Sequence, residues 1–188
     1  MKHIIVKSSD LGDNWTAEHH IAKAEAAKPP MRLIHHSPEP FEFDPEYVYT
    51  HHEIAYSVGK PRGLWLSDEA TDWGWRAWCE AESFRPDALD YETEFTLTPE
   101  ANVLIITTED EFKAFSAEWR ATPNPDYPWK DYLNGIDWPR VAERYDGIII
   151  TPYRSESRFD FENFWYAGWD CASECIWNLR AIAPKSDA

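Results

Sequence analysis

The residues best suited to chemistry lie in one aromatic run late in the sequence, residues 165–179. This run holds two carboxylates, Asp170 and Glu174, among tryptophan, tyrosine and cysteine side chains. A carboxylate beside indole rings loses hydration, and the low local dielectric strengthens its interactions with other charges. Either acid is therefore a candidate catalytic group if it faces a cleft. The alternative is a structural acid that caps a turn or pairs with Arg180.

The apolar stretch at residues 175–179 predicts a buried strand, which places Glu174 where that strand begins. A carboxylate at a strand end that faces a cleft is a common catalytic arrangement. We therefore favour Glu174 as the catalytic carboxylate. Asp170 stays a second candidate because Trp169 directly precedes it.

A second group of polar residues follows the apolar stretch that begins at residue 31. Residues 31–38 predict a strand that ends in His35, His36 and Ser37. Such a strand presents His and Ser at a sheet edge, where ligands often bind. The alternative for each histidine is a structural hydrogen bond.

A third group lies in the turn and strand at residues 63–67. Gly63 allows the backbone to approach a ligand closely, and Trp65 offers a ring face to a planar heterocycle. Leu64 and Ser67 complete the short strand. The alternative is a hairpin turn that leads into a core strand, with Trp65 used for packing.

The composition restricts the class of protein. The chain has 188 residues and a net charge of −16, from 34 acidic and 18 basic residues. This charge disfavours binding to nucleic acid or to an anionic membrane. Three cysteines without framework spacing, and an apolar run within residues 1–7 too short for a signal peptide, predict a cytoplasmic protein. We expect one domain over residues 1–188.

Histidine pairs recur at a spacing of sixteen residues and suggest a metal site. The pairs are His19-His20, His35-His36 and His51-His52. None has the spacing of a helical or strand ligand motif, so we expect no metal.

The remaining patterns predict helices between strands. Expected strands are residues 91–97, 103–106 and 148–150, and in the first of them Tyr91, Phe95 and Leu97 face the core. Expected helices are 14–28, 68–84, 109–120 and a short one after Asp137. The second helix begins at Asp68 or Thr71, and its tryptophan stripe, Trp73, Trp75 and Trp78, is assigned to the core. Thr108 and Glu111 form a capping box for the third helix. Several strands alternate, and this favours an α+β fold with mixed or antiparallel sheets over a doubly wound parallel sheet.

Four short motifs in this order resemble those of the ADP-ribosyltransferase superfamily, in its histidine-containing, diphtheria-toxin and poly-ADP-ribose-polymerase branch. They are Leu33-Ile34-His35-His36-Ser37, Gly63-Leu64-Trp65-Leu66-Ser67, Tyr145-Asp146-Gly147-Ile148 and Ser173-Glu174-Cys175-Ile176-Trp177. The resemblance implies split mixed or antiparallel sheets with flanking helices, and NAD as substrate. It departs from the family pattern at His36, where Gly is common, and at Trp65, where Tyr is common.

The resemblance also implies roles for these residues. His35 would bond the adenosine ribose, the His36 backbone would hold the carboxamide, and Trp65 would stack on nicotinamide. The other binding residues would be Ser37, Gly63, Leu64 and Ser67. Glu174, or Asp170 as in some members that use an aspartate, would stabilise the oxocarbenium-like state.

The expected activity is that of a glycosyltransferase acting on NAD, which transfers ADP-ribose to a macromolecular acceptor. The net charge favours a protein acceptor over a nucleic acid. The loops at residues 39–56 and 121–135 are long enough to contact the acceptor or cover the cleft. Two alternatives remain: an NAD glycohydrolase, with water as acceptor, and a non-enzymatic, acidic, aromatic-rich domain that binds a protein partner.

Overall fold

A computed structural model describes residues 31–49, 60–122 and 135–185. Apart from Met31, these residues belong to one compact unit, Arg32–Ala188. The predicted helix at 14–28, the pairs His19-His20 and His51-His52, and parts of both long loops lie outside the described residues. The single domain over residues 1–188 therefore stays a prediction.

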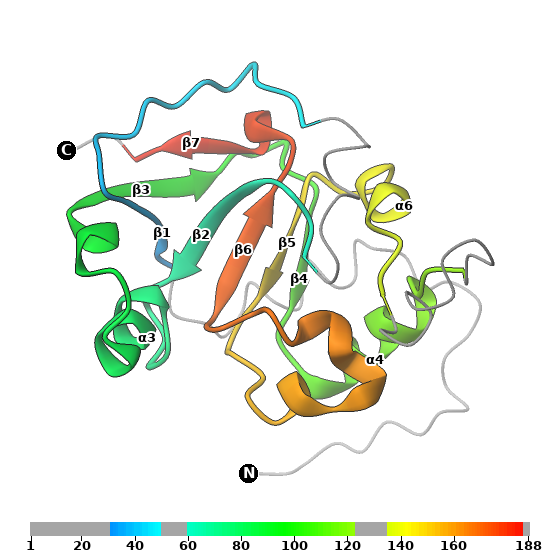
Figure 1. Cartoon of the computed structure of the whole chain (residues 1–188). Helices are drawn as coiled ribbons and strands as arrows, with labels where there is room; N and C mark the ends of the chain where they lie inside the picture. Colours follow the sequence, from blue (N-terminus) through cyan, green and yellow to red (C-terminus); the bar gives the residue numbers. More distant parts are fainter. Residues whose placement is uncertain (1–30, 50–59, 123–134, 186–188) are drawn as a thin grey trace, which may run out of the picture. The chain divides into compact units, whose positions relative to one another are not determined.

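Seven strands form one mixed sheet in the order β4-β5-β6-β2-β1-β3-β7 (Figure 1). The strands are β1 Leu33–Ser37, β2 Leu64–Asp68, β3 Tyr91–Leu97, β4 Val103–Ile106, β5 Gly147–Ile150, β6 Ser173–Ile176 and β7 Ile182–Pro184. Strands β4 and β5 are parallel, and the other neighbours are antiparallel. The mixed α+β class is confirmed. The expected split into separate sheets is not observed, because β6 pairs with both β5 and β2 and joins the strands into one sheet.

Three α-helices accompany the sheet among the described residues: α3 Trp75–Glu82, α4 Glu109–Glu118 and α6 Trp138–Ala142. Short stretches of 3-10 helix complete the set, namely η2 Pro86–Leu89, η3 Ser157–Phe159, η4 Phe161–Tyr166 and η5 Leu179–Ala181. Side chains of α4, α6 and η4 pack with β5 and β6 into an aromatic core around Trp138, Trp165 and Trp169. This core lies against one face of the part of the sheet formed by β4, β5, β6 and β2.

The predicted caps of two helices are confirmed. The Thr108 hydroxyl oxygen accepts a hydrogen bond from the Glu111 amide, and the Glu111 carboxylate accepts one from the Thr108 amide, which starts α4. The Asp137 side chain accepts from the Arg140 amide and starts α6. These side chains satisfy amides that the first turn of a helix leaves without intrahelical partners.

The predicted helix over residues 68–84 is wrong at its start. Helix α3 begins after Gly74, while Asp68 ends β2 and is buried. Its carboxylate accepts from the Thr151 hydroxyl instead of capping a helix. In β3, Phe95 is buried as expected, but Tyr91 is 46% exposed because it lies at the strand end, paired only with Ser37.

Candidate functional site

The four motif segments come together at the centre of the sheet. Strands β5, β6, β2 and β1 are consecutive neighbours, although they are far apart in the sequence (Figure 1). Leu66 lies directly opposite Glu174, and Ile149 lies opposite it on the other side. Strand β1, which carries the histidines, is therefore separated from β6, which carries Glu174, by β2 alone.

Glu174 is the second residue of β6 rather than the residue that opens it. Its side chain has no exposed surface, so it does not face an open cleft as expected. Neither carboxyl oxygen has a hydrogen-bond partner among the described residues. Burial, with smaller contributions from the charges of Asp68 and Glu69, raises the pKa of Glu174 well above its usual value. Burial therefore favours the protonated form of this carboxyl.

Asp68 is a buried acid beside Glu174 that the sequence patterns did not single out. Glu174 pairs with Leu66 of β2, and Asp68 lies two residues beyond Leu66 on the same strand. The two acids therefore lie on the same face of the sheet. Asp68 accepts hydrogen bonds from the Thr151 hydroxyl at 2.8 Å and from the Arg32 and Ala70 amides at 3.1 Å each. Its lone pairs are therefore used, whereas those of Glu174 are not.

His35 lies on the same sheet face as Glu174. Leu33 pairs with Asp68 and so lies on the same face as Asp68 and Glu174. His35 follows Leu33 by two residues along β1 and therefore lies on that face too. The His35 ring contacts Phe41, with centroids 4.3 Å apart, and its Nδ1 lies 2.9 Å from the Trp65 carbonyl oxygen. Burial lowers the pKa of His35. A neutral ring that donates from Nδ1 leaves Nε2 as an acceptor for a ligand hydroxyl.

The other predicted residues of β1 have partners within the chain. The Nε2 of His36 lies 3.0 Å from Oε1 of Glu69, on the opposite sheet face from His35. The Ser37 hydroxyl donates to the Glu39 carbonyl at 2.7 Å. A ligand at these side chains would have to replace existing bonds.

Trp65 does not share a face with Glu174. It lies opposite Cys175, and its ring packs edge-on against Trp169 with centroids 4.8 Å apart. The ammonium of Lys60 lies 4.8 Å from the Trp65 ring centroid. The structure therefore brings His35 and Glu174 to one face and places Trp65 with the aromatic core on the other.

The remaining predicted residues in and directly before β2 serve the fold in this structure. A Cβ on Gly63 would lie 2.6 Å from the Ile176 carbonyl oxygen, so the close approach that requires glycine is to β6. Leu64 is buried in the core. The Ser67 hydroxyl accepts from the Trp75 amide at 2.7 Å and so positions the start of α3.

Asp170, the second candidate acid, is half-buried and paired with two cations. Its Oδ1 accepts from Arg158 at 2.6 Å, and its Oδ2 lies 3.9 Å from the Lys60 ammonium. The Trp73 indole donates to its backbone carbonyl. These contacts tie Asp170 to the wall of a pocket.

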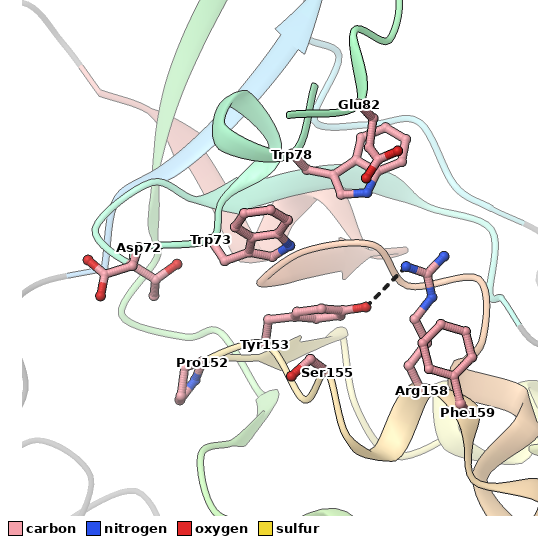
Figure 2. A pocket seen from close by; sticks show the side chains of 10 residues that line it. Asp72, Trp73, Trp78, Glu82, Pro152, Tyr153, Ser155, Arg158 and Phe159 are labelled. Atoms are coloured by element: carbon pink, nitrogen blue, oxygen red, sulfur yellow. Dashed lines mark hydrogen bonds between the residues drawn. The ribbon is translucent and has the colours of Figure 1, made fainter. Parts of the chain in front are cut away.

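This pocket lies where the chain leaves β2 and β5, and it has a volume of about 390 Å³ (Figure 2). Four aromatic rings contribute to its lining: Trp73, Trp78, Tyr153 and Phe159. Sequence reasoning missed Tyr153 and Arg158 and assigned the tryptophans to the core. The one available signal was the cluster of aromatic and charged residues in the polar segment after β5.

Among the described residues, no group of three or more His, Cys, Asp or Glu side chains could hold a metal ion. Within the same residues, no helix is long and apolar enough to cross a membrane. Comparisons with protein-family models, curated proteins and solved structures found no match. The site is therefore interpreted from its own geometry and from the motif resemblance.

The buried carboxyl of Glu174 predicts a pH-dependent stability. The folded state holds this proton at pH values where an unfolded glutamate, with pKa near 4.5, has lost it. The free energy of unfolding therefore falls as pH rises from 4.5 to the raised pKa, by up to about 1.4 kcal/mol per pH unit. Glu174→Gln is expected to remove this slope. Urea unfolding at pH 5 and pH 7 measures the free energy of unfolding of the wild-type protein and of the variant. An equal change between the two pH values in both proteins would contradict a raised pKa of Glu174.

Proposed function

We propose that the chain is an NAD-dependent ADP-ribosyltransferase that cleaves the nicotinamide–ribose bond and transfers ADP-ribose to a macromolecular acceptor. The observation that carries this proposal is the juxtaposition of the four motif segments on β5, β6, β2 and β1. All four segments are separated from one another by more than twenty residues in the sequence, so their adjacency is not a consequence of chain connectivity. The shared sheet face of His35 and Glu174 supports the same proposal.

In this proposal Glu174 stabilises the positive charge that develops on the ribose. The bond between ribose C1′ and the nicotinamide nitrogen breaks, and its electron pair leaves with neutral nicotinamide. Because the ring is cationic beforehand, no general acid is needed. A nucleophile of the acceptor then bonds to C1′ and gives up its proton to the carboxylate. His35 would accept a hydrogen bond from the adenosine ribose at Nε2.

The buried state of Glu174 adds two requirements to this mechanism. The side chains that cover the carboxyl must move before NAD reaches it, because it has no exposed surface. It must also lose its proton to stabilise a cation, and the cationic nicotinamide ring favours that ionisation. Since its pKa in the free protein is raised, kcat/KM for NAD is expected to increase as pH rises from the ordinary glutamate pKa of 4.5 through the raised pKa of Glu174.

His35→Ala is expected to weaken NAD binding about tenfold, because a hydrogen bond of this kind contributes ~1–2 kcal/mol. The measurement is calorimetric titration of the full chain with NAD. The melting temperature is the control, and it should change little because the bond from His35 to the Trp65 carbonyl is half-buried. An unfolded variant, or a folded one with unchanged affinity, would assign His35 a structural role.

One observation favours a second function, that of a non-enzymatic binding domain. One candidate acid, Glu174, is fully buried, and the other, Asp170, is paired with Arg158 and Lys60, so neither is free for catalysis in this structure. Such a domain would not bind NAD. The third alternative, an NAD glycohydrolase, would release free ADP-ribose without any acceptor, so product analysis separates it from the transferase.

A further inference from the structure

The pocket between β2, β5 and α3 has aromatic walls. Figure 2 shows the Trp73 ring above the Tyr153 ring, with Trp78 beside Glu82 and Phe159 next to Arg158. Phe159 is 82% exposed and Trp73 38%, so the pocket opens at a surface where apolar rings contact water. Apolar rings held at an open pocket are available for a ligand.

The charges around these rings are predominantly acidic. Asp72 lies at one end of the pocket, and Glu82 lies beside Trp78 at the other (Figure 2). The cation in the lining, Arg158, is compensated: it donates to Asp170 at 2.6 Å, to the Ala167 carbonyl at 3.0 Å and to the Tyr153 hydroxyl at 3.4 Å. The pocket therefore has an excess of negative charge.

Aromatic faces together with carboxylates are the chemistry that recognises a cationic side chain. A guanidinium stacks on indole and phenol rings and forms forked hydrogen bonds with carboxylates, and an ammonium gains the cation–π attraction alone. The net charge of −16 draws basic segments toward the surface and repels polyanions. These features favour arginine over a nucleobase or a phosphate as the ligand.

We propose that this pocket binds an arginine side chain of a basic protein segment, stacked between Trp73 and Tyr153 with its guanidinium directed to the carboxylate of Glu82. The volume of about 390 Å³ has room for one such side chain. The proposal does not depend on the NAD reaction, because Glu174 and His35 are absent from the lining of the pocket.

The test is a titration of the full chain, without NAD, with a tetra-arginine peptide and with a peptide of the same length containing citrulline, which is isosteric but uncharged. Tryptophan fluorescence reports binding, and calorimetry gives the affinity. We expect the arginine peptide to bind and the citrulline peptide to bind at least tenfold more weakly. Binding should weaken as salt concentration rises.

Glu82→Gln and Glu80→Gln form a matched pair of variants. Both acids belong to α3 and each change removes one negative charge, but only Glu82 lines the pocket. We expect Glu82→Gln to weaken the arginine peptide roughly five- to tenfold and Glu80→Gln to leave its affinity within about twofold. Equal effects of the two variants, equal binding of both peptides, or fluorescence quenching by a single-stranded oligonucleotide but not by the arginine peptide would overturn the proposal.

Discussion

Glu174→Gln is expected to lower turnover of NAD by roughly 10²–10³ while NAD still binds. The change keeps the size and shape of a side chain that has no exposed surface, so the packing around it is retained. It removes the one charge that the proposed mechanism places beside the ribose. Because that charge interacts most strongly with the transition state, the loss should fall on kcat rather than on NAD affinity. Nicotinamide release under saturating NAD measures it.

Asp170→Asn is the matched control for this prediction. It alters the other acid of the same segment but leaves Glu174 in place, and its expected cost is a weakened contact with Arg158. We expect turnover to fall much less than in Glu174→Gln. The reverse ranking would transfer the catalytic role to Asp170, and two fully active variants would remove both acids from the mechanism.

Trp165→Ala is expected to destabilise the fold by ~3–5 kcal/mol, a large share of the ~5–15 kcal/mol that holds a typical domain together. Trp165 is 1% exposed and stacks on Phe112, with ring centroids 5.1 Å apart. Its indole also donates to the buried Ser116 hydroxyl at 3.0 Å. Removal of the ring would leave a cavity and an unsatisfied hydroxyl in the core.

The neighbouring residue Phe164 provides the control for the stability measurement. It is another large aromatic in η4, but its side chain is 43% exposed. Phe164→Ala is expected to change the free energy of unfolding by less than about 1 kcal/mol. Urea unfolding followed by circular dichroism compares the two. Similar losses in both variants would show that Trp165 does not anchor the core.

Local patterns in the sequence predicted most of the elements that the structure describes. Alternation located β3, the apolar runs located β4 and β5, and the capping box of Thr108 and Glu111 located the start of α4. These signals depend on neighbours within a few residues, which a single sequence displays. Strand β7, only three residues long at Ile182–Pro184, gave no periodic signal and was missed.

The candidate site was predictable only in part, because long-range pairing decides which face a side chain occupies. The motifs identified Glu174 and His35, and strand register places them on one face. The same register turns Trp65 to the other face, which a motif read along the chain does not reveal. Asp68 has the pattern of a helix cap, yet its bond with Thr151, 83 residues away, holds it at the end of a strand.

The pocket beside Asp170 was not predictable for the same reason. Its lining comes from α3 and from the segments after β2 and β5, and the sequence does not show that these meet. Trp73 and Trp78 were assigned to the core because a tryptophan stripe at helical spacing is usually buried. Trp73 instead precedes α3 and is partly exposed.

The most direct test of the proposed transferase activity is incubation of the full chain with NAD labelled in its adenylate phosphate, in the presence and absence of cell lysate. The proposal predicts release of nicotinamide and transfer of label to macromolecules in the lysate, with both lost in Glu174→Gln. Protein-bound label should outweigh label on nucleic acid, as the net charge of −16 favours a protein acceptor. Absence of nicotinamide release from the wild-type protein, with and without lysate, would contradict the account.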